Sequence, residues 1–449
     1  MKYSVITFGC RVNQADASNI EESFRARGAI AADAAEADIV VVNTCSVTAS
    51  ADQAARQTIR RVSRINPAAD IVVTGCYATR RPDEVAGLPN VLCVIPNDDK
   101  PRTIPLIFAD LISNGRVIRL EPELTTADRF GDGHGSCGAV LEPGIGGRTA
   151  FTLRVQTGCG EQCSYCIIPT TRGRPRSLSI QEVVAEIRRV TAARFKEIVV
   201  TGVHLGSYGR DLSPRSSLSG LLDALRDCAI EGETLLRISS LEPMDCTPEI
   251  VNLVATAEQF APHFHLPLQH ASNRMLRAMR RPYTIEYYRG LVDDIRSRMP
   301  QAAIGSDIIV GFPGESEDDF RETLSLVEAV AFDDAFTFRY SPREGTPATR
   351  LKDVVPDPVA GERLERLVAA VRGIARRKNV ALVGSTHEVL VEGWAKRGDL
   401  LQGRTRANKV ALFPGPDQWI GSYRMVRFTG TTGSTFAART VGQELAVVG

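Results

Sequence analysis

Three cysteines in one short run constrain this chain more than any other feature of its sequence. Cys159, Cys163 and Cys166 have the spacing C-x3-C-x2-C. Three thiolates at this spacing can hold three irons of a [4Fe–4S] cube, which normally takes four cysteine ligands. No fourth cysteine lies within reach of the run. One iron of such a cluster is therefore left open to a ligand from outside the chain.

Zinc and plain burial are the alternative interpretations of these thiols. Zinc fingers usually use C-x2-C pairs with a second matching pair or with histidines. No such partner follows Cys166 in the chain. The spacing therefore favours an iron–sulfur cluster over a zinc site or three buried structural cysteines.

Length and charge exclude several classes of protein. A chain of 449 residues is too long for one hydrophobic core and predicts two to four domains. Its 43% of hydrophobic and 24% of charged residues are ordinary for a soluble globular enzyme. The net charge of +1 excludes a globally basic protein, so any affinity for nucleic acid must come from local patches.

Targeting signals are missing from the sequence as given. The first residues read as a strand and lack the apolar region and cleavage site of a signal peptide. No apolar run approaches the ~20 residues needed to cross a bilayer. We therefore expect a cytoplasmic protein without a membrane segment, in which the ten cysteines serve metal binding or catalysis rather than disulfides.

The first part of the chain alternates apolar runs with amphipathic stretches. The runs rich in Val and Ile are Tyr3–Gly9, Ile39–Asn43 and Ile71–Gly75. The stretches with helical spacing are Ala15–Arg27 and Ala51–Arg64. This rhythm predicts an open parallel sheet covered by helices.

A second group of cysteines follows these strands. Cys10, Cys45 and Cys76 each stand directly after one of the three predicted strands. The carboxyl ends of parallel strands share one edge of a sheet, where binding sites form. A single cysteine there is usually a buried structural residue, but three at equivalent positions favour a second [4Fe–4S] site with three cysteine ligands.

A longer β/α alternation follows a glycine-rich stretch. Residues 131–148 are aperiodic and predict a linker, in which we interpret His134 and Cys137 as incidental. The predicted strands beyond it are Thr152–Gln156, Glu197–Gly202, Leu235–Ser239, His263–Leu268, Ala303–Val310 and Ala335–Arg339. Six strand–helix units predict a partial (β/α)6 barrel with its site at the strand carboxyl ends. Cys159 follows the first of these strands.

The end of the chain has a different character. An amphipathic helix is predicted within residues 356–383, followed by short alternating runs separated by Gly, Pro and Asp. The runs predict a small antiparallel barrel, and they are His387–Gly393, Lys409–Phe413, Arg424–Thr429 and Phe436–Val441. We therefore expect an α/β protein with an N-terminal domain (1–130), a linker (131–148), a partial barrel (149–355), a connecting helix (356–383) and a small barrel (384–449).

The aromatic Tyr165 completes the pattern C-x3-C-x-Φ-C, which resembles that of the radical-SAM superfamily. In that superfamily the open iron binds S-adenosylmethionine (SAM). Two three-cysteine sites in this order, followed by a small barrel similar to a TRAM domain, resemble the radical-SAM methylthiotransferases over nearly the whole chain. This resemblance implies two [4Fe–4S] clusters and SAM as cofactors.

Within the family, several segments are most similar to the MtaB-type branch, which modifies N6-threonylcarbamoyladenosine next to the tRNA anticodon. They are Phe8–Gln14, Val42–Thr48, Thr201–Gly209, Ser240–Pro243 and Tyr340–Pro347. The isopentenyladenosine (MiaB-like) branch tends to carry a histidine at Glu242 and Pro-Gly at Glu344-Gly345. The run Leu401–Val410, however, looks more like that second branch.

Three alternatives stay open. The same chemistry on isopentenyladenosine tRNA is one, and a ribosomal-protein aspartate as substrate is another. The third belongs to a different class: a non-catalytic RNA-binding protein with structural metal.

The resemblance also implies a division of labour between the two cysteine sites. The cluster at Cys159, Cys163 and Cys166 would cleave SAM and start hydrogen abstraction from C2 of the adenine, while the cluster at Cys10, Cys45 and Cys76 would supply sulfur. The residues that the resemblance places at SAM are Tyr165, Thr201, Gly202 and Glu242. A tight turn after the strand is the alternative role of Gly202. The histidines, including His204, are interpreted as structural or substrate-facing.

Local positive charge predicts where RNA binds. Arg172 and Arg174 follow the cysteine run, and residues 376–409 hold eight Lys/Arg against three Asp/Glu. We expect RNA contacts from Arg172, Arg174, Arg404, Arg406 and Lys409, with loop bases stacked on Phe413 or Trp419. A solvated surface is the alternative. The expected partners are the tRNA anticodon loop, an electron donor such as flavodoxin or ferredoxin, and a sulfur source, with the chain acting as a monomer.

Overall fold

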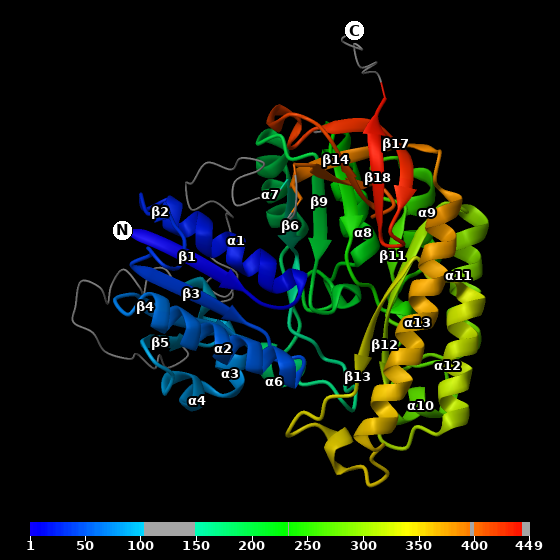
Figure 1. The fold of residues 1–449 in the computed structure, drawn as a ribbon, viewed down its shortest axis with the longest axis horizontal. Coiled ribbons are helices and arrows are strands. Elements are labelled where there is room, and N and C mark those ends of the chain that lie inside the picture. The colour runs from blue at the N-terminus through cyan, green and yellow to red at the C-terminus, as the bar shows by residue number, and fades with distance from the viewer. Residues whose placement is uncertain (103–148, 232, 396–398, 442–449) are drawn as a thin grey trace.

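The computed structural model describes residues 1–102, 149–231, 233–395 and 399–441. The predicted linker, with His134 and Cys137, lies outside these residues. An N-terminal α/β domain lies against the side of an open barrel, and a small barrel covers one end of that barrel (Figure 1). No helix in the described ranges is both long and apolar enough to span a bilayer.

A five-stranded parallel sheet forms the N-terminal domain, in the order β2-β1-β3-β4-β5. Its central strand β3 is buried along its whole length, which explains its continuous apolar run. The three predicted strands are confirmed, and the sheet is extended by the edge strands β2 and β5. Helix α1 begins at Arg11, directly after Cys10, rather than at Ala15. The elements are β1 (Lys2–Thr7), α1 (Arg11–Arg25), β2 (Ile30–Ala31), β3 (Ile39–Thr44), α2 (Ala49–Ile65), β4 (Asp70–Gly75), α3 (Cys76–Arg80), α4 (Pro82–Ala86), β5 (Val91–Ile95) and the 3-10 helix η1 (Asn97–Arg102).

The central domain is an open arc of parallel strands. Two three-stranded sheets, β6-β9-β10 and β11-β12-β13, are joined by the bridges Leu236–Phe260 and Ser240–His265. Among the described strands β6 and β13 do not pair, so the arc is open on one side. The predicted partial barrel is confirmed, although the first predicted strand is divided into β6 and the short β7. The strands are β6 (Ala150–Arg154), β7 (Gln156–Thr157), β8 (Arg176–Ser177), β9 (Glu197–Thr201), β10 (Leu235–Ile238), β11 (His263–His265), β12 (Ala303–Val310) and β13 (Asp334–Arg339).

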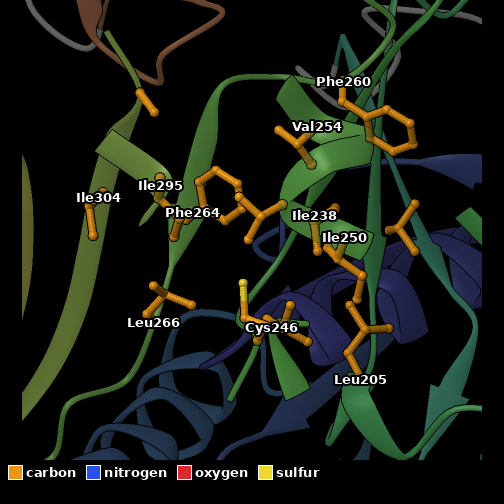
Figure 2. Packing of buried hydrophobic residues seen from close by; sticks show 14 of the residues in the cluster. Leu205, Ile238, Cys246, Ile250, Val254, Phe260, Phe264, Leu266, Ile295 and Ile304 are labelled. Atoms are coloured by element: carbon orange, nitrogen blue, oxygen red, sulfur yellow. The ribbon is translucent and has the colours of Figure 1, made fainter. Parts of the chain in front are cut away.

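One large hydrophobic core lies between these strands and the outer helices. Ile238, Phe264 and Ile304 of the strands pack with Ile250 and Ile295 of the helices (Figure 2). Burying each such side chain stabilises the fold by about 1.5–3 kcal/mol. The core therefore holds the strand ends, and the loops that follow them, in fixed places. The helices are α6 (Ile168–Arg172), α7 (Ile180–Ala192), α8 (Leu218–Glu231), α9 (Pro248–Thr256), α10 (Asn273–Ala278), α11 (Ile285–Arg298) and α12 (Glu317–Val330), with the 3-10 helices η4 (Leu205–Ser207), η5 (Pro243–Asp245) and η6 (Pro347–Arg350).

Helix α13 leads to a closed barrel of five strands in the order β14-β15-β16-β18-β17. Sequence patterns missed β15, in which Gln402 and Arg404 alternate with buried positions. The pair β16–β18 is parallel and the other pairs are antiparallel, so the predicted antiparallel pairing is correct for every pair but one. The elements are α13 (Asp357–Ala381), β14 (Thr386–Trp394), β15 (Leu401–Thr405), β16 (Val410–Phe413), η7 (Asp417–Trp419), β17 (Tyr423–Thr431) and β18 (Thr435–Thr440).

The small barrel is attached to the amino ends of the central strands. The Tyr423 hydroxyl donates to the Lys196 carbonyl just before β9 at 3.0 Å. Lys409 Nζ donates to Asp333 just before β13, also at 3.0 Å. Cys159 follows the carboxyl end of the first strand, so the small barrel and the cysteine run lie at opposite ends of the arc (Figure 1).

Candidate active site

The cysteine run forms a loop that is closed at its base. Strand β7 pairs with β8, and the Cys159 amide donates to the Gly173 carbonyl at 3.0 Å. Gly158 has a φ of +76°, and a Cβ there would stand 1.9 Å from the Arg174 carbonyl oxygen. Only glycine fits this position. The three cysteines of the loop are half-buried, so they are held in place and yet accessible to a ligand.

Arg281 connects Cys163 with Glu242. Its Nη1 donates to Cys163 Sγ at 3.1 Å, and its Nη2 forms an ion pair with Glu242. The arginine is buried and lies over the Tyr283 ring. A buried cation beside a sulfur favours the thiolate that binds metal. Glu242 is therefore linked to the cysteine loop through Arg281, which contacts both.

His204 lies at Cys159, where sequence reasoning gave it no specific role. Its Nε2 is 2.9 Å from Asp245 Oδ2, and its amide donates to Gln156 at 2.9 Å. Burial lowers the pKa of His204, but hydrogen bonds with Asp245 and Cys159 more than offset this and raise it to about 9. His204 is therefore a second basic group beside the loop.

The other predicted SAM residues lie at the same end of the arc. Thr201 is the last residue of β9, and its hydroxyl receives a hydrogen bond from Ser239 at 3.1 Å. A Cβ at Gly202 would stand 3.0 Å from Gln156 Oε1, so the backbone there is closely packed. Tyr165 is half-buried and meets the Phe312 ring edge-on at 6.4 Å. These positions surround the cysteine loop.

The three N-terminal cysteines also come together. Cys10 precedes α1, Cys45 follows β3, and Cys76 is the first residue of α3. Gly9, with a φ of +91°, passes so close to Cys45 that a Cβ would stand 2.7 Å from its sulfur. The pKa of Cys45 is raised to about 11, mainly by burial and further by the neighbouring thiols of Cys76 and Cys10.

Buried cations surround this second triplet. Asp16 forms ion pairs with Lys100 at 2.6 Å, with Arg172 at 3.2 Å and with Arg154. Within the described residues these three cations share the carboxylate of Asp16. Burial alone would raise the pKa of Cys76, but Arg172 and Lys100 more than offset it, so the pKa of this thiol is lowered. The surroundings therefore suit negatively charged thiolates.

Both triplets fit a cluster better than a single ion. In the described part of the chain, no three metal-binding side chains converge closely enough to hold one ion. Cysteines that bind different irons of a cube stand farther apart than ligands of one ion. The thiols of Cys159, Cys163 and Cys166 are half-buried, whereas Cys10 is exposed and Cys45 and Cys76 are buried. Each triplet offers three thiols and would leave one iron of a cube without a protein ligand.

Of the residues predicted to contact RNA, some are exposed in the structure and others are buried. Arg174 is exposed, as a phosphate contact must be. Arg172 is buried against Asn13 and Asp16, which argues against the predicted phosphate contact. Phe413 is fully buried in the core of the small barrel, so the prediction that it stacks on bases is wrong.

The positive run near residue 404 mostly faces protein. Arg404 pairs with Glu392 at 2.8 Å, and Lys409 pairs with Asp333 at 3.0 Å. Arg406 donates to the Glu258 carbonyl before β11. These side chains hold the small barrel together or attach it to the central domain. The sequence alone could not show these contacts. Asp333 and the Glu258 carbonyl are far along the chain from their partners, and no motif marks Glu392 as the partner of Arg404.

Family models match three separate parts of the chain. The uncharacterized protein family UPF0004 matches residues 2–95, the Radical SAM superfamily matches residues 153–327, and the TRAM domain matches residues 380–432. The last match identifies the small barrel as a TRAM domain. Together the three matches contain both cysteine triplets.

Curated relatives match over almost their whole length. A tRNA-2-methylthio-N(6)-dimethylallyladenosine synthase of Carboxydothermus hydrogenoformans is 34% identical over 95% of this chain and 96% of that protein. The threonylcarbamoyladenosine tRNA methylthiotransferase MtaB of Bacillus subtilis is also 34% identical, over 94% and 92%. Relatives of both substrate branches thus match the chain at similar identity, so identity does not distinguish the two substrates.

Solved structures support the fold. The radical S-adenosylmethionine methyltransferase TsrM of Kitasatospora setae, with cobalamin and a [4Fe–4S] cluster bound, has a TM-score of 0.53 and 16% identity, over 77% of this chain and 76% of that chain. From these domain matches and relatives, the chain belongs to the radical-SAM methylthiotransferase family, which uses SAM and [4Fe–4S] clusters and to which both of these tRNA-modifying relatives belong.

Proposed function

We propose that this protein adds a methylthio group to C2 of N6-threonylcarbamoyladenosine next to the anticodon of tRNA. The observation that carries the substrate choice is the placement of Glu242, a position where the isopentenyladenosine branch tends to carry histidine. Its carboxylate pairs with Arg281, which also donates to Cys163. A residue that differs between the two branches is therefore linked, through Arg281, to a cysteine that would hold the SAM cluster.

The cysteines have separate tasks in this proposal. Cys159, Cys163 and Cys166 would hold the SAM-binding cluster, and Cys10, Cys45 and Cys76 would hold the cluster that carries sulfur. When bound, these groups supply the one-electron chemistry and the sulfur needed to replace an unactivated C–H bond. Arg281 and His204 hold positive charge at Cys163 and Cys159, while Arg172 and Lys100 do so at Cys76.

RNA would reach the site across strand β13, at the open side of the arc. Phe336 and Phe338 point away from α13 and are 55% and 37% exposed, and Phe336 lies against the His265 ring at 5.8 Å. Exposed rings of this kind stack on splayed bases. Phe336 and Phe338 are therefore added to the aromatic residues proposed to stack on bases, although the sequence analysis did not select them.

A groove lies on the other face of the same strand. Its volume is about 700 Å³, and it runs between β13, α13 and the β17–β18 turn. Arg372 and Arg376 line it, and within the described residues neither has an ion-pair or hydrogen-bond partner there. Free guanidinium groups at a groove bind phosphate well. We propose that the RNA backbone lies here, with Arg174 as a further contact near the cysteine loop.

Isopentenyladenosine is the second candidate substrate. Residues 401–410 resemble that branch, and the exposed rings of Phe336 and Phe338 would also accept an apolar prenyl group. A ribosomal-protein aspartate has no such support from the TRAM domain or from the tRNA-modifying relatives.

Nucleoside analysis tests this choice. Anaerobically reconstituted protein would be given SAM, a reductant and two anticodon stem-loop RNAs, one with threonylcarbamoyladenosine and one with isopentenyladenosine. Mass spectrometry should detect a methylthio product from the first RNA. A product from the second RNA alone would overturn the substrate choice. Colourless protein that binds RNA but contains zinc and no iron would overturn the enzymatic proposal as a whole.

A further inference from the structure

Two buried arginines of the central domain reach into the N-terminal domain. Arg172 is at the end of α6, shortly after Cys166, and Arg343 is in the loop after β13. Their exposed fractions are only 3% and 4%. Buried guanidinium groups are costly unless they are fully paired. The partners of Arg172 and Arg343 therefore indicate which part of the N-terminal domain these two side chains fix in place.

Arg172 acts on two cysteine loops through Asn13. Its Nη2 donates to Asn13 Oδ1 and, at 3.2 Å, to Asp16. The Asn13 amide in turn donates to the Phe8 carbonyl at 2.7 Å and to the Thr44 carbonyl at 3.0 Å. Phe8 and Thr44 stand just before Cys10 and Cys45. One arginine from the SAM domain thus fixes the side chain that ties these two loops together.

The same helix contacts the third cysteine loop. Asn97 donates to the Thr171 carbonyl at 2.8 Å, and its amide lies 3.6 Å from Cys76 Sγ. Arg172 itself also lies near Cys76 and lowers the pKa of its thiol. The end of α6 therefore contacts the surroundings of all three N-terminal cysteines.

Arg343 holds the remaining side of the triplet. Its Nε donates to the Ser46 carbonyl at 3.0 Å, and its Nη2 donates to Asp52 at 2.9 Å. Ser46 directly follows Cys45. Arg80, in the helix that begins with Cys76, donates to the hydroxyl of Ser46 at 2.9 Å and also to Asp52. Asp52 is thus shared by an arginine from each domain.

We propose that Arg172 and Arg343 are positioning residues that make the geometry of the N-terminal cysteine site depend on the docked SAM domain. This inference rests on the proposed function. Arg172 holds the loops of Cys10 and Cys45 through Asn13, and Arg343 holds Ser46 directly after Cys45. Arg172 stands six residues after Cys166 in the chain. The two arginines align the sulfur-carrying site with the SAM-cleaving site.

The test uses Arg172→Met, Arg343→Met and Arg343→Lys in the full-length, anaerobically reconstituted protein. Arg81→Met is the matched control, because Arg81 crosses the same interface to Glu344 but both side chains are largely exposed. The assay measures 5′-deoxyadenosine and methylthio product together. We expect 5′-deoxyadenosine per product to rise roughly 10–100-fold in the two methionine variants. Arg343→Lys should restore part of the coupling, and the control should behave as wild type.

A second measurement does not depend on activity. The same substitutions are placed in a protein with Cys159, Cys163 and Cys166 all changed to Ala, which leaves only the N-terminal site. Electron paramagnetic resonance of the reduced protein should show an altered or heterogeneous signal with Arg343→Met and an unchanged one with Arg81→Met. An unchanged signal in both would overturn the inference.

Two further outcomes would overturn it as well. A ratio within about twofold of wild type in Arg172→Met and Arg343→Met would show that the arginines do not affect coupling. A parallel loss of 5′-deoxyadenosine, product and iron would show that they only stabilise the fold. Failure of the wild-type protein to modify either RNA would instead overturn the proposed function, while the spectroscopic measurement would still test the positioning role.

Discussion

The two cysteine triplets reach similar surroundings by different routes. Cys159, Cys163 and Cys166 lie in one loop whose base is closed by β7 and β8. Cys10, Cys45 and Cys76 come from three strand ends and meet when the sheet that contains β1, β3 and β4 has formed. A local site is encoded by its own spacing, whereas a dispersed site depends on packing elsewhere in the molecule. The predictions below test this difference.

Loss of the local site should have the largest effect. Cys163→Ala is expected to abolish both SAM cleavage and methylthio product, because no other triplet binds SAM. Iron should fall from about eight to about four per chain, measured by metal analysis of anaerobic protein. Cys228→Ala is the control, since this buried cysteine of α8 lies in the apolar core. Full iron content in Cys163→Ala would show that this loop holds no cluster.

Loss of the dispersed site should separate the two half-reactions. Cys45→Ala is expected to keep SAM cleavage, seen as 5′-deoxyadenosine by chromatography, and to lose the methylthio product. Iron should again be about four per chain. If cleavage were lost too, the two sites would not have separate tasks.

Substitution of Gly158 in the closed loop should destabilise the protein more than substitution of Gly28 in an ordinary turn, because the backbone around Gly158 is crowded. Gly158 and Gly28 both have positive φ values, of +76° and +74°, but only Gly158 has atoms that a Cβ would meet. Gly28→Ala should cost about 1–2 kcal/mol of unfolding free energy. Gly158→Ala should cost roughly 2–4 kcal/mol and also reduce iron loading, because the loop base must shift. Equal losses in denaturant titrations would show that the loop base is not rigid.

The groove beside β13 should contribute to RNA affinity without affecting either triplet. Arg372→Ala with Arg376→Ala is expected to weaken tRNA binding roughly tenfold at low salt and to reduce the salt slope of log K by about 2. Arg321→Ala is the control, since this exposed arginine of α12 pairs with Asp318. The dissociation constant is measured by fluorescence anisotropy at several salt concentrations, and an unchanged slope would exclude phosphates from the groove.

The smallest effect concerns an ion pair away from the cysteines. Glu22 of α1 pairs with Arg189 of α7, and burial raises the pKa of Glu22 to about 7. A carboxyl with a raised folded pKa binds more protons folded than unfolded, so stability is lost as pH rises from about 4.5 through 7. Glu22→Gln should flatten this dependence in thermal melts between pH 5 and pH 8, by about 1–3 kcal/mol. An unchanged pH profile would show that Glu22 is ionised throughout.

Much of the architecture could be predicted because it rests on local patterns. Buried parallel strands such as β3 are continuous apolar runs, and the spacing of Cys159, Cys163 and Cys166 needs no knowledge of the fold. The grouping of Cys10, Cys45 and Cys76 followed from one rule about strand ends. Strand β15 was missed because Gly403 and Thr405, at two of its three buried positions, are not apolar, so the sequence shows no apolar alternation.

The surroundings of the sites could not be predicted, because they depend on contacts between distant residues. Arg281 lies 118 residues from Cys163, and Asn13 lies 159 residues from Arg172. A charge run also does not reveal its partners, so Lys409 was assigned to RNA although it pairs with Asp333. Phe413 was misassigned because an aromatic residue in a short strand can point to either face.

Arg237 has a consequence for how the molecule can be divided. It is buried with Glu197 inside the central arc, and its Nη1 also donates to the Arg406 carbonyl of the TRAM domain at 3.0 Å. Truncation before residue 384 would remove that acceptor and uncover a buried ion pair. We therefore expect the TRAM domain to unfold together with the catalytic domain, so that calorimetry of the intact chain does not resolve a separate transition for it.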